Sequence, residues 1–334
     1  MAKPELTDYV TLIFTLFDEF EQQEQLETAP VKKLYTYSQK SFIVLFICLQ
    51  FRHIYKFKAQ KRWLEEHLEM LDLLQWKQIP HRTTFSRRYK ALAPVLDRFI
   101  LFVGESNASL GDAFTTTHLV EDKSLFKAQG PVWHQRDRKA GVIPAKLRRL
   151  DTDATWGKSA YQGWVYGYGL HLTCSEAAFP KMIVVETAAI KESVVIEQKS
   201  KTLLTRLFPL TLAADNGYTK ASRIRNWAKQ GVILLTPATK WVNGRFAKAY
   251  HRFLKQPENR QRLSRRRTSV EPLFDLIAQV LGCQGRHKQL PIQTLPNVKT
   301  CLALATLTVQ VAMIMNAMWQ LPHRNVSHIR AVLS

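Results

Sequence analysis

Three carboxylates stand where a sequence could place them for chemistry. Asp215 ends a short apolar run at 210–214 and is followed by Asn-Gly. Asp122 lies inside a segment with the composition of a strand, and Glu271 lies at the start of a segment with an apolar stripe. Carboxylate oxygens are hard ligands of the kind that Mg²⁺ and Mn²⁺ prefer. Three of them on separate elements would suit metal-assisted chemistry.

The residues after Asp215 decide how this carboxylate is interpreted. Asn216-Gly217 alone is a strong hairpin signal. Residues 218–230 have helical character, however, so the pair is predicted to lie in a strand-to-helix loop, in which Gly217 could adopt a positive φ. Asp215 then lies at the carboxyl end of a strand, where open α/β sheets place their ligand sites. Capping of the following helix remains an alternative role.

The other two carboxylates also have structural alternatives. Asp122 and Glu121 point to opposite faces of the predicted strand, so only one of them can face a site, and an exposed edge strand would also explain a charge there. Glu271 lies three residues after Thr268, as in a capping box. Pro272 has no N–H and disfavours that register, whereas Ser269 as N-cap would leave Glu271 free to project into a cleft.

The order of the predicted elements defines a fold class. Strands are predicted at 117–126, 163–172, 181–187, 210–215 and 232–237, with helices at 191–207 and 218–230. Three strands followed by helix, strand, helix and strand is the order of ribonuclease-H-like folds. We therefore expect an α/β protein with a ribonuclease-H-like mixed sheet flanked by helices, over residues 111–325. Basic insertions are expected at 127–162 and 238–267, and apolar helices at 269–282 and about 294–320.

Residues 1–110 are predicted to be helical throughout. Within them, 60–103 could form a helix-turn-helix-like unit whose last helix carries Arg87 and Arg88 toward DNA. An ordinary helical hairpin with solvated arginines explains the same pattern.

Charge indicates the class of partner. Among 334 residues, 48 Lys and Arg oppose 27 Asp and Glu, a formal net charge of +21. Such an excess favours a polyanionic partner, DNA or RNA first. The two most apolar runs, 41–51 and 301–315, are shorter than the roughly 20 residues of a membrane span and are expected to be buried helices. With no leader-like segment at the N-terminus and four scattered cysteines, we expect a cytoplasmic, nucleoid-associated protein with reduced thiols and no membrane contact.

Three stretches together resemble bacterial insertion-sequence transposases of the DDE type. They are DTDATWGKSAYQGWVYGYGLHL (151–172), LAADNGY (212–218) and RRRTSVEPLFDLIAQVLG (265–282). The family has a strand bearing a first Asp, an Asp-x-Gly-Tyr element on the fourth strand, and a late helix with Arg and Glu four residues apart. The resemblance implies that Asp122, Asp215 and Glu271 are the catalytic, metal-binding triad. It also implies that Arg267 contacts phosphate near the scissile bond.

Some positions depart from the family pattern. One version of the late motif has Tyr and Lys where this chain has Ser264 and Ala278. Lys158 is a candidate for a replacement cation near the site. Three other aspartates are rivals for the first position of the triad: Asp112, Asp151 and Asp153.

The implied activity is that of a transposase, a metal-dependent polynucleotidyl transferase. It would cleave transposon ends and join the freed 3′-hydroxyl to target DNA, with Mg²⁺ or Mn²⁺, two ions, as cofactor. The partners would be double-stranded DNA, as terminal repeats and target, and a second copy of the chain. DNA contacts are expected from six basic residues: Arg267, Arg266, Arg265, Arg87, Arg88 and Lys158. A nuclease without strand transfer and a non-catalytic DNA-binding protein derived from a transposase are the alternatives.

Aromatic residues among these basic segments have two interpretations. Trp133, His134 and Trp156 lie in the insertion at 127–162 and could stack on unpaired bases. Packing into a core is the commoner role of tryptophan.

Overall fold

The computed structural model describes residues 4–27, 37–241, 243–327, 329 and 331. By contact the chain divides into two compact units, one of residues 104–275 and one of residues 1–103 with 276–334. The sequence-based division at 110/111 differs mainly because 276–325 cluster with the N-terminal helices.

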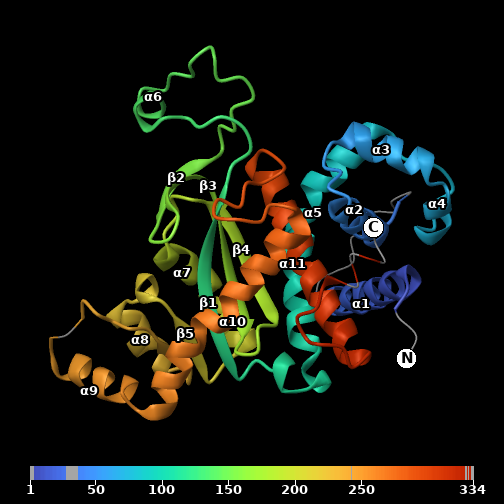
Figure 1. Cartoon of the computed structure of the whole chain (residues 1–334). Coiled ribbons are helices and arrows are strands. Elements are labelled where there is room, and N and C mark those ends of the chain that lie inside the picture. Colours follow the sequence, from blue (N-terminus) through green and yellow to red (C-terminus); the bar gives the residue numbers. More distant parts are fainter. Residues whose placement is uncertain (1–3, 28–36, 242, 328, 330, 332–334) are drawn as a thin grey trace. The chain divides into compact units, whose positions relative to one another are not determined.

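The unit of residues 104–275 is built on one mixed sheet. It contains β1 (His118–Lys127), β2 (Thr155–Ser159), β3 (Gly163–Ser175), β4 (Pro180–Thr187), β5 (Thr211–Ala214) and β6 (Ile233–Leu235). β3 pairs antiparallel with β1, β2 and β4, whereas β1, β5 and β6 are mutually parallel in that order. This is the ribonuclease-H-like arrangement that the order of elements predicts, and Figure 1 shows helices on its faces. The sequence missed β2, which is only five residues long.

The helices of this unit alternate with the later strands. α7 (Glu192–Thr202) continues into a π-helical turn (Leu203–Leu207), and α8 (Ala221–Ala228) joins β5 to β6. Short 3₁₀ turns lie at Ala108–Leu110, Asp112–Phe114 and Asn216–Tyr218. The expected helices at 191–207 and 218–230 are therefore present with shifted ends.

A buried ion pair joins α7 to the sheet. Lys199 Nζ lies 2.8 Å from Glu121 Oε2 and 3.0 Å from Thr173 Oγ1, and neither charged side chain is exposed. Thr173 also donates a hydrogen bond to Glu121. Because a buried charge is costly unless it is paired, this network fixes which face of β1 lies against α7. Glu121 occupies that face, so its neighbour Asp122 faces the other side of the sheet.

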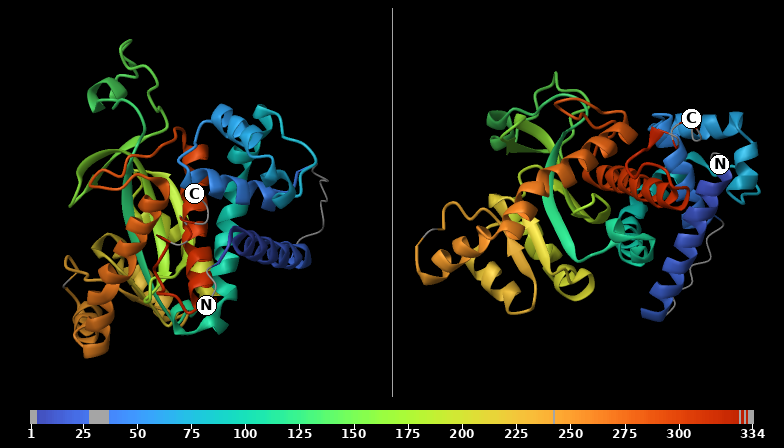
Figure 2. Two further views of the ribbon diagram at one scale, coloured as in Figure 1. Left: turned by 45° about the vertical axis from the view of Figure 1, so that its right-hand side comes forward. Right: turned by 60° about the horizontal axis from the view of Figure 1, so that its bottom comes forward.

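The basic segment 238–267 is more regular than expected. It contains α9 (Arg245–Leu254) and the first part of α10 (Pro257–Leu281). The expectation that a helix begins near Ser269 is thus wrong: α10 starts twelve residues earlier, at Pro257, and Pro272 lies in its interior. The other insertion, between β1 and β2, contains the five-residue helix α6 (Gln135–Lys139). Figures 1 and 2 show this segment extending beyond the end of β1.

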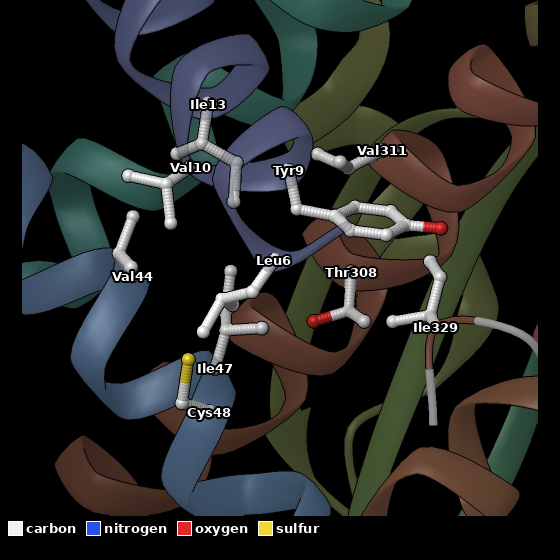
Figure 3. Close-up of a pocket in the computed structure, with 10 residues that line it drawn as sticks. All are labelled: Leu6, Tyr9, Val10, Ile13, Val44, Ile47, Cys48, Thr308, Val311 and Ile329. Atoms are coloured by element: carbon white, nitrogen blue, oxygen red, sulfur yellow. The ribbon is translucent and has the colours of Figure 1, made fainter. Parts of the chain in front are cut away.

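The second unit is helical. It contains α1 (Leu6–Glu27), α2 (Gln39–Phe51), α3 (Phe57–Glu66), α4 (Glu69–Leu73), most of α5 (Arg82–Ser106) and α11 (Leu295–Met318). Aromatic pairs such as Phe17–Phe99 and Phe46–Tyr89, with ring centroids 5.0 and 4.9 Å apart, fill its core. Figure 3 shows a narrow pocket there, with the Tyr9 ring lying across it. Seven of the ten residues around this pocket are aliphatic, and the other three, Tyr9, Cys48 and Thr308, include no carboxylate or imidazole.

The apolar runs are buried helices, as predicted. α2 and α11 are buried over most of their length, and polar side chains of α11 bond to carbonyls of α5: Thr300 Oγ1 to Tyr89 at 2.7 Å and Gln310 Nε2 to Ile100 at 2.9 Å. Among the described residues, α11 is long and apolar enough to cross a membrane. A buried core helix of the same length and composition meets the same criterion. All four cysteines are buried and free.

Candidate active site

Two of the three predicted carboxylates meet at neighbouring strand positions. β1 and β5 run parallel, and their last aligned pair is Glu121 with Ala214. Asp122 and Asp215 are the next residue along each strand. The negative charge of Asp215 raises the pKa of Asp122, as expected for carboxylates at close quarters.

Asp122 is held by two donors. Arg266 Nη1 lies 2.7 Å from its Oδ2, and the Lys123 amide N–H donates to its Oδ1 at 2.8 Å. Burial raises the pKa of Asp122 to about 7, although both donors oppose the shift, and Asp215 and Glu121 add to it. Burial and a neighbouring carboxylate both disfavour the ionised form of Asp122, and a cation beside it favours that form. Here the cation is the Arg266 guanidinium.

Asp215 is oriented by the turn that follows it. Its Oδ1 accepts the Gly217 N–H at 2.7 Å, so the side chain caps the 3₁₀ turn at Asn216–Tyr218. The capping alternative is therefore correct in geometry. It is compatible with a second role, because this hydrogen bond is made by only one of the two carboxylate oxygens.

The lack of a side chain, and not a positive φ, explains why glycine occupies position 217. It is absent from the residues with positive φ in the described chain, contrary to the sequence-based expectation. A Cβ there would lie 3.0 Å from Asp215 Oδ1 and 3.2 Å from Glu192 Oε2. Glycine therefore lets two carboxylates approach the same loop.

Glu192 and Lys123 are neighbours of the site that the sequence did not reveal. Lys123 Nζ donates to the carbonyls of Ala188 and Ile190 at 3.1 and 2.7 Å and lies 3.9 Å from Glu192 Oε1. Burial lowers the pKa of Lys123, while Glu192 and Asp215 oppose that shift. No sequence motif marks either residue, because they are far apart in the sequence and come together only where loop 188–191 folds over Lys123.

Glu271 is an exposed residue of α10 whose ion-pair contact is with Arg267 of the same helix. It is in the middle of α10, its side chain is 62% exposed, and its Oε1 is 3.9 Å from Arg267 Nε, one helical turn away. Neither capping interpretation applies to a residue at this position. The face of α10 toward the sheet instead carries Arg262, Arg266 and Ser269, which bond to His118, Asp122 and the Glu176 carbonyl.

Asp122 and Asp215 could therefore supply part of a binding site for a divalent cation. Asp122 and Asp215 offer hard oxygen ligands side by side. Among the described residues, however, no three His, Cys, Asp or Glu side chains are placed to hold a metal ion together. The described conformation brings Asp122 and Asp215 to neighbouring strand positions and does not gather Glu271 into a group of three ligands with them.

The three rival aspartates lie in other parts of the local structure. Asp151 is buried and accepts a hydrogen bond from the Tyr168 hydroxyl at 2.8 Å. The Asp153 N–H bonds to Asp151 Oδ1 at 3.3 Å, and Asp112 opens a 3₁₀ turn on the surface. Of the three, Asp151 thus has a structural role for its carboxylate.

The predicted DNA-binding residues differ in exposure. Arg265, Arg267, Arg87 and Lys158 are exposed. Arg266 is buried against Asp122, and Arg88 donates to the Tyr37 carbonyl at 3.0 Å. In the described conformation the first four are available to phosphate, whereas Arg266 and Arg88 are engaged within the protein.

A ribonuclease-H-like sheet with paired carboxylates at the ends of neighbouring parallel strands defines a class of enzymes that act on polynucleotides. Within that class, the family model described as "Transposase DDE domain" matches residues 114–290, more than half of the chain. The protein belongs to this family of transposases, whose members generally use divalent metal ions and act on DNA. No curated protein and no solved structure matches the chain.

Proposed function

We propose that this chain is an active transposase that cleaves the ends of a transposon and joins the freed 3′-hydroxyl to target DNA. The observation that carries the proposal is the juxtaposition of Asp122 and Asp215 on neighbouring parallel strands. Asp122, Asp215 and Glu271 are proposed as the catalytic residues, the third on the resemblance of the Arg267-Thr-Ser-Val-Glu271 segment alone.

In this proposal the two aspartates hold Mg²⁺ or Mn²⁺, and two ions are expected. Such ions activate a water or a 3′-hydroxyl and stabilise the leaving oxygen of a phosphodiester. Backbone N–H groups of the chain orient the two aspartates. The Gly217 N–H orients Asp215, and the Lys123 N–H orients Asp122. Arg266 neutralises Asp122 when no metal is bound.

The exposed basic residues are proposed to hold the DNA. Arg265 and Arg267 lie on the same stretch of α10 as Arg266, and Lys158 lies on β2. Arg87 and Arg88, on α5, are proposed to contact the terminal repeat. A homodimer on paired ends, in the cytoplasm at the nucleoid, completes the proposal.

The test is a supercoiled plasmid that carries the terminal sequences flanking this gene, incubated with the full chain and Mg²⁺. The proposal predicts cuts at the ends and products joined to a second DNA. Cutting without joining would identify a nuclease. Binding without cutting would identify a non-catalytic DNA-binding protein.

A further inference from the structure

The β2–β3 hairpin displays two aromatic rings to solvent. Tyr161 and Trp164 are 74% and 61% exposed, and no other Phe, Tyr or Trp side chain in the described part of the chain is as exposed. Contiguous exposed apolar surface marks contact sites, whereas single exposed apolar residues are common. The function proposed above does not use either residue.

The register of the hairpin fixes the face on which the Trp164 ring lies. Val165, the next residue after Trp164, is buried against Leu125 and Ala188. Because side chains alternate along a strand, Trp164 must point to the opposite face. Lys158 is its cross-strand partner, and Lys158 Nζ lies 5.9 Å from the centre of the Trp164 ring.

The turn at the tip is held by its own hydrogen bonds. Ser159 Oγ accepts the N–H groups of Tyr161 and Gln162 at 3.2 and 3.3 Å. Gly163 closes the turn with a φ of 76°, a conformation that favours glycine. The rings are therefore carried on an ordered hairpin, which lowers the entropic cost of using them in binding.

The hairpin lies at the end of the sheet toward which β1 runs. The last pair between β1 and β3 is Lys127 with Gly167, so residues 163–166 extend beyond it. Asp215 also lies at the carboxyl end of its strand, parallel to β1. Asp122 pairs with Leu172, and Trp164 lies eight residues before Leu172 on β3, so the hairpin lies beyond the candidate active site in the direction in which β1 and β5 run.

The chemistry of this surface selects its ligand. Flat aromatic faces beside a lysine suit nucleobases, since every base has a face that stacks and every nucleotide has a phosphate for the cation. We propose that Tyr161 and Trp164 stack on unpaired bases of the DNA substrate while Lys158 contacts the neighbouring phosphate. This inference rests on the proposed function.

The tryptophans singled out from the sequence make hydrogen bonds within the insertion. Trp133 Nε1 donates to the Val142 carbonyl at 2.9 Å, and Trp156 Nε1 donates to the Trp133 carbonyl at 2.8 Å. Their ring N–H groups order the insertion between β1 and β2. His134 precedes α6 as its N-cap residue.

The test compares two fluorescently labelled duplexes of the same sequence, one blunt and one with a single-stranded extension. Binding is measured by anisotropy for the full-length wild type, Tyr161→Ala, Trp164→Ala and the double variant. Tyr161→Phe and Trp164→Phe are matched controls that keep a ring. Stacking on one base corresponds to roughly five- to hundredfold in affinity. We expect each Ala variant to lose at least about fivefold for the extended duplex only, and the Phe variants to bind as the wild type does.

The outcomes separate this inference from the function on which it rests. Equal affinity of the wild type and Ala variants for the extended duplex would overturn the stacking proposal and leave DNA binding intact. Equal losses on both duplexes would overturn it as well. Wild-type protein that binds neither DNA would overturn both proposals. Thermal unfolding of each variant is measured alongside, and the exposed positions predict unchanged midpoints.

Discussion

At the scale of single residues, the contact between Asp122 and Arg266 organises the candidate site. Both side chains are mostly buried, and the 2.7 Å contact is a charge-assisted hydrogen bond. It joins α10 to β1 through the same carboxylate that is proposed to bind metal. The stability of the metal-free protein and the chemistry of the site thus share one group.

Replacing Arg266 should therefore cost stability. Arg266→Ala is expected to lower the free energy of unfolding by about 1.5–3 kcal/mol, because it removes a hydrogen bond to a charged group and leaves a buried carboxylate without its cation. Urea unfolding without metal measures this. Arg265→Ala, one residue away and exposed, is the control and is expected to stay within about 0.5 kcal/mol of the wild type. Similar losses in the two variants would contradict the assigned contact.

The sequence could locate the two aspartates but not what surrounds them. Asp215 was predictable because an apolar run stops at it and a helix follows. Asp122 was identifiable because charges inside strands are rare. The Arg266 contact was not predictable, since it joins residues 144 positions apart. The exposure of Glu271 was missed because the start of α10 was placed near Ser269 and not at Pro257.

At the scale of elements, a buried lysine at the start of β4 sets a constraint on the fold. Lys181 has no exposed surface, and its Nζ donates to the carbonyls of Gly104, at 2.5 Å, and Phe114. Burial lowers the pKa of Lys181 to about 7, although Glu105 and Cys174 oppose the shift. The same contact explains Gly104, where a Cβ would lie 2.6 Å from the Lys181 carbonyl oxygen.

This lysine predicts a pH dependence of stability. In the unfolded chain a lysine has a pKa of about 10.4, so between about pH 7 and 10 the unfolded state binds more protons than the native state. Stability contributed by this group therefore rises with pH across that window. Lys181→Met should flatten the rise by up to about 1.4 kcal/mol per pH unit. Urea unfolding from pH 7 to 9 measures it, with exposed Lys201→Met as control. Parallel curves for Lys181→Met and wild type would refute the assignment.

Most elements were predictable, and the exceptions have physical reasons. The long alternating pattern of β3, the apolar stripe of α10 and the continuous apolar run of α11 are local signals, so these elements could be predicted directly from the sequence. β2 has only five residues, and one of them, Gly157, has no side chain, so the segment has too little pattern to mark a strand. The arginine-rich half of α10 has few apolar residues, and its helix is stabilised by contacts such as Arg262 with His118, which only the folded chain provides.

At the scale of the whole molecule, the net charge of +21 predicts how DNA binding responds to salt. Each phosphate neutralised by Lys or Arg contributes about −0.9 to the slope of log affinity against log salt concentration. Arg265→Ala and Arg267→Ala should each reduce the magnitude of that slope by about one. Anisotropy titrations at several salt concentrations measure it. Arg98, whose Nε lies 2.7 Å from Glu24, is the control, and its Ala variant should keep the wild-type slope. Unchanged slopes for both α10 variants would remove these residues from the DNA interface.

The rate of DNA end cleavage in Mg²⁺ tests the central claim most directly. Wild-type protein is compared with Asp122→Asn, Asp215→Asn and the surface control Asp112→Asn, each first shown to bind the same DNA. If the paired aspartates form the active site, the first two variants lose at least about a thousandfold in rate while the control keeps it. Cleavage by Asp215→Asn at close to the wild-type rate would contradict the account.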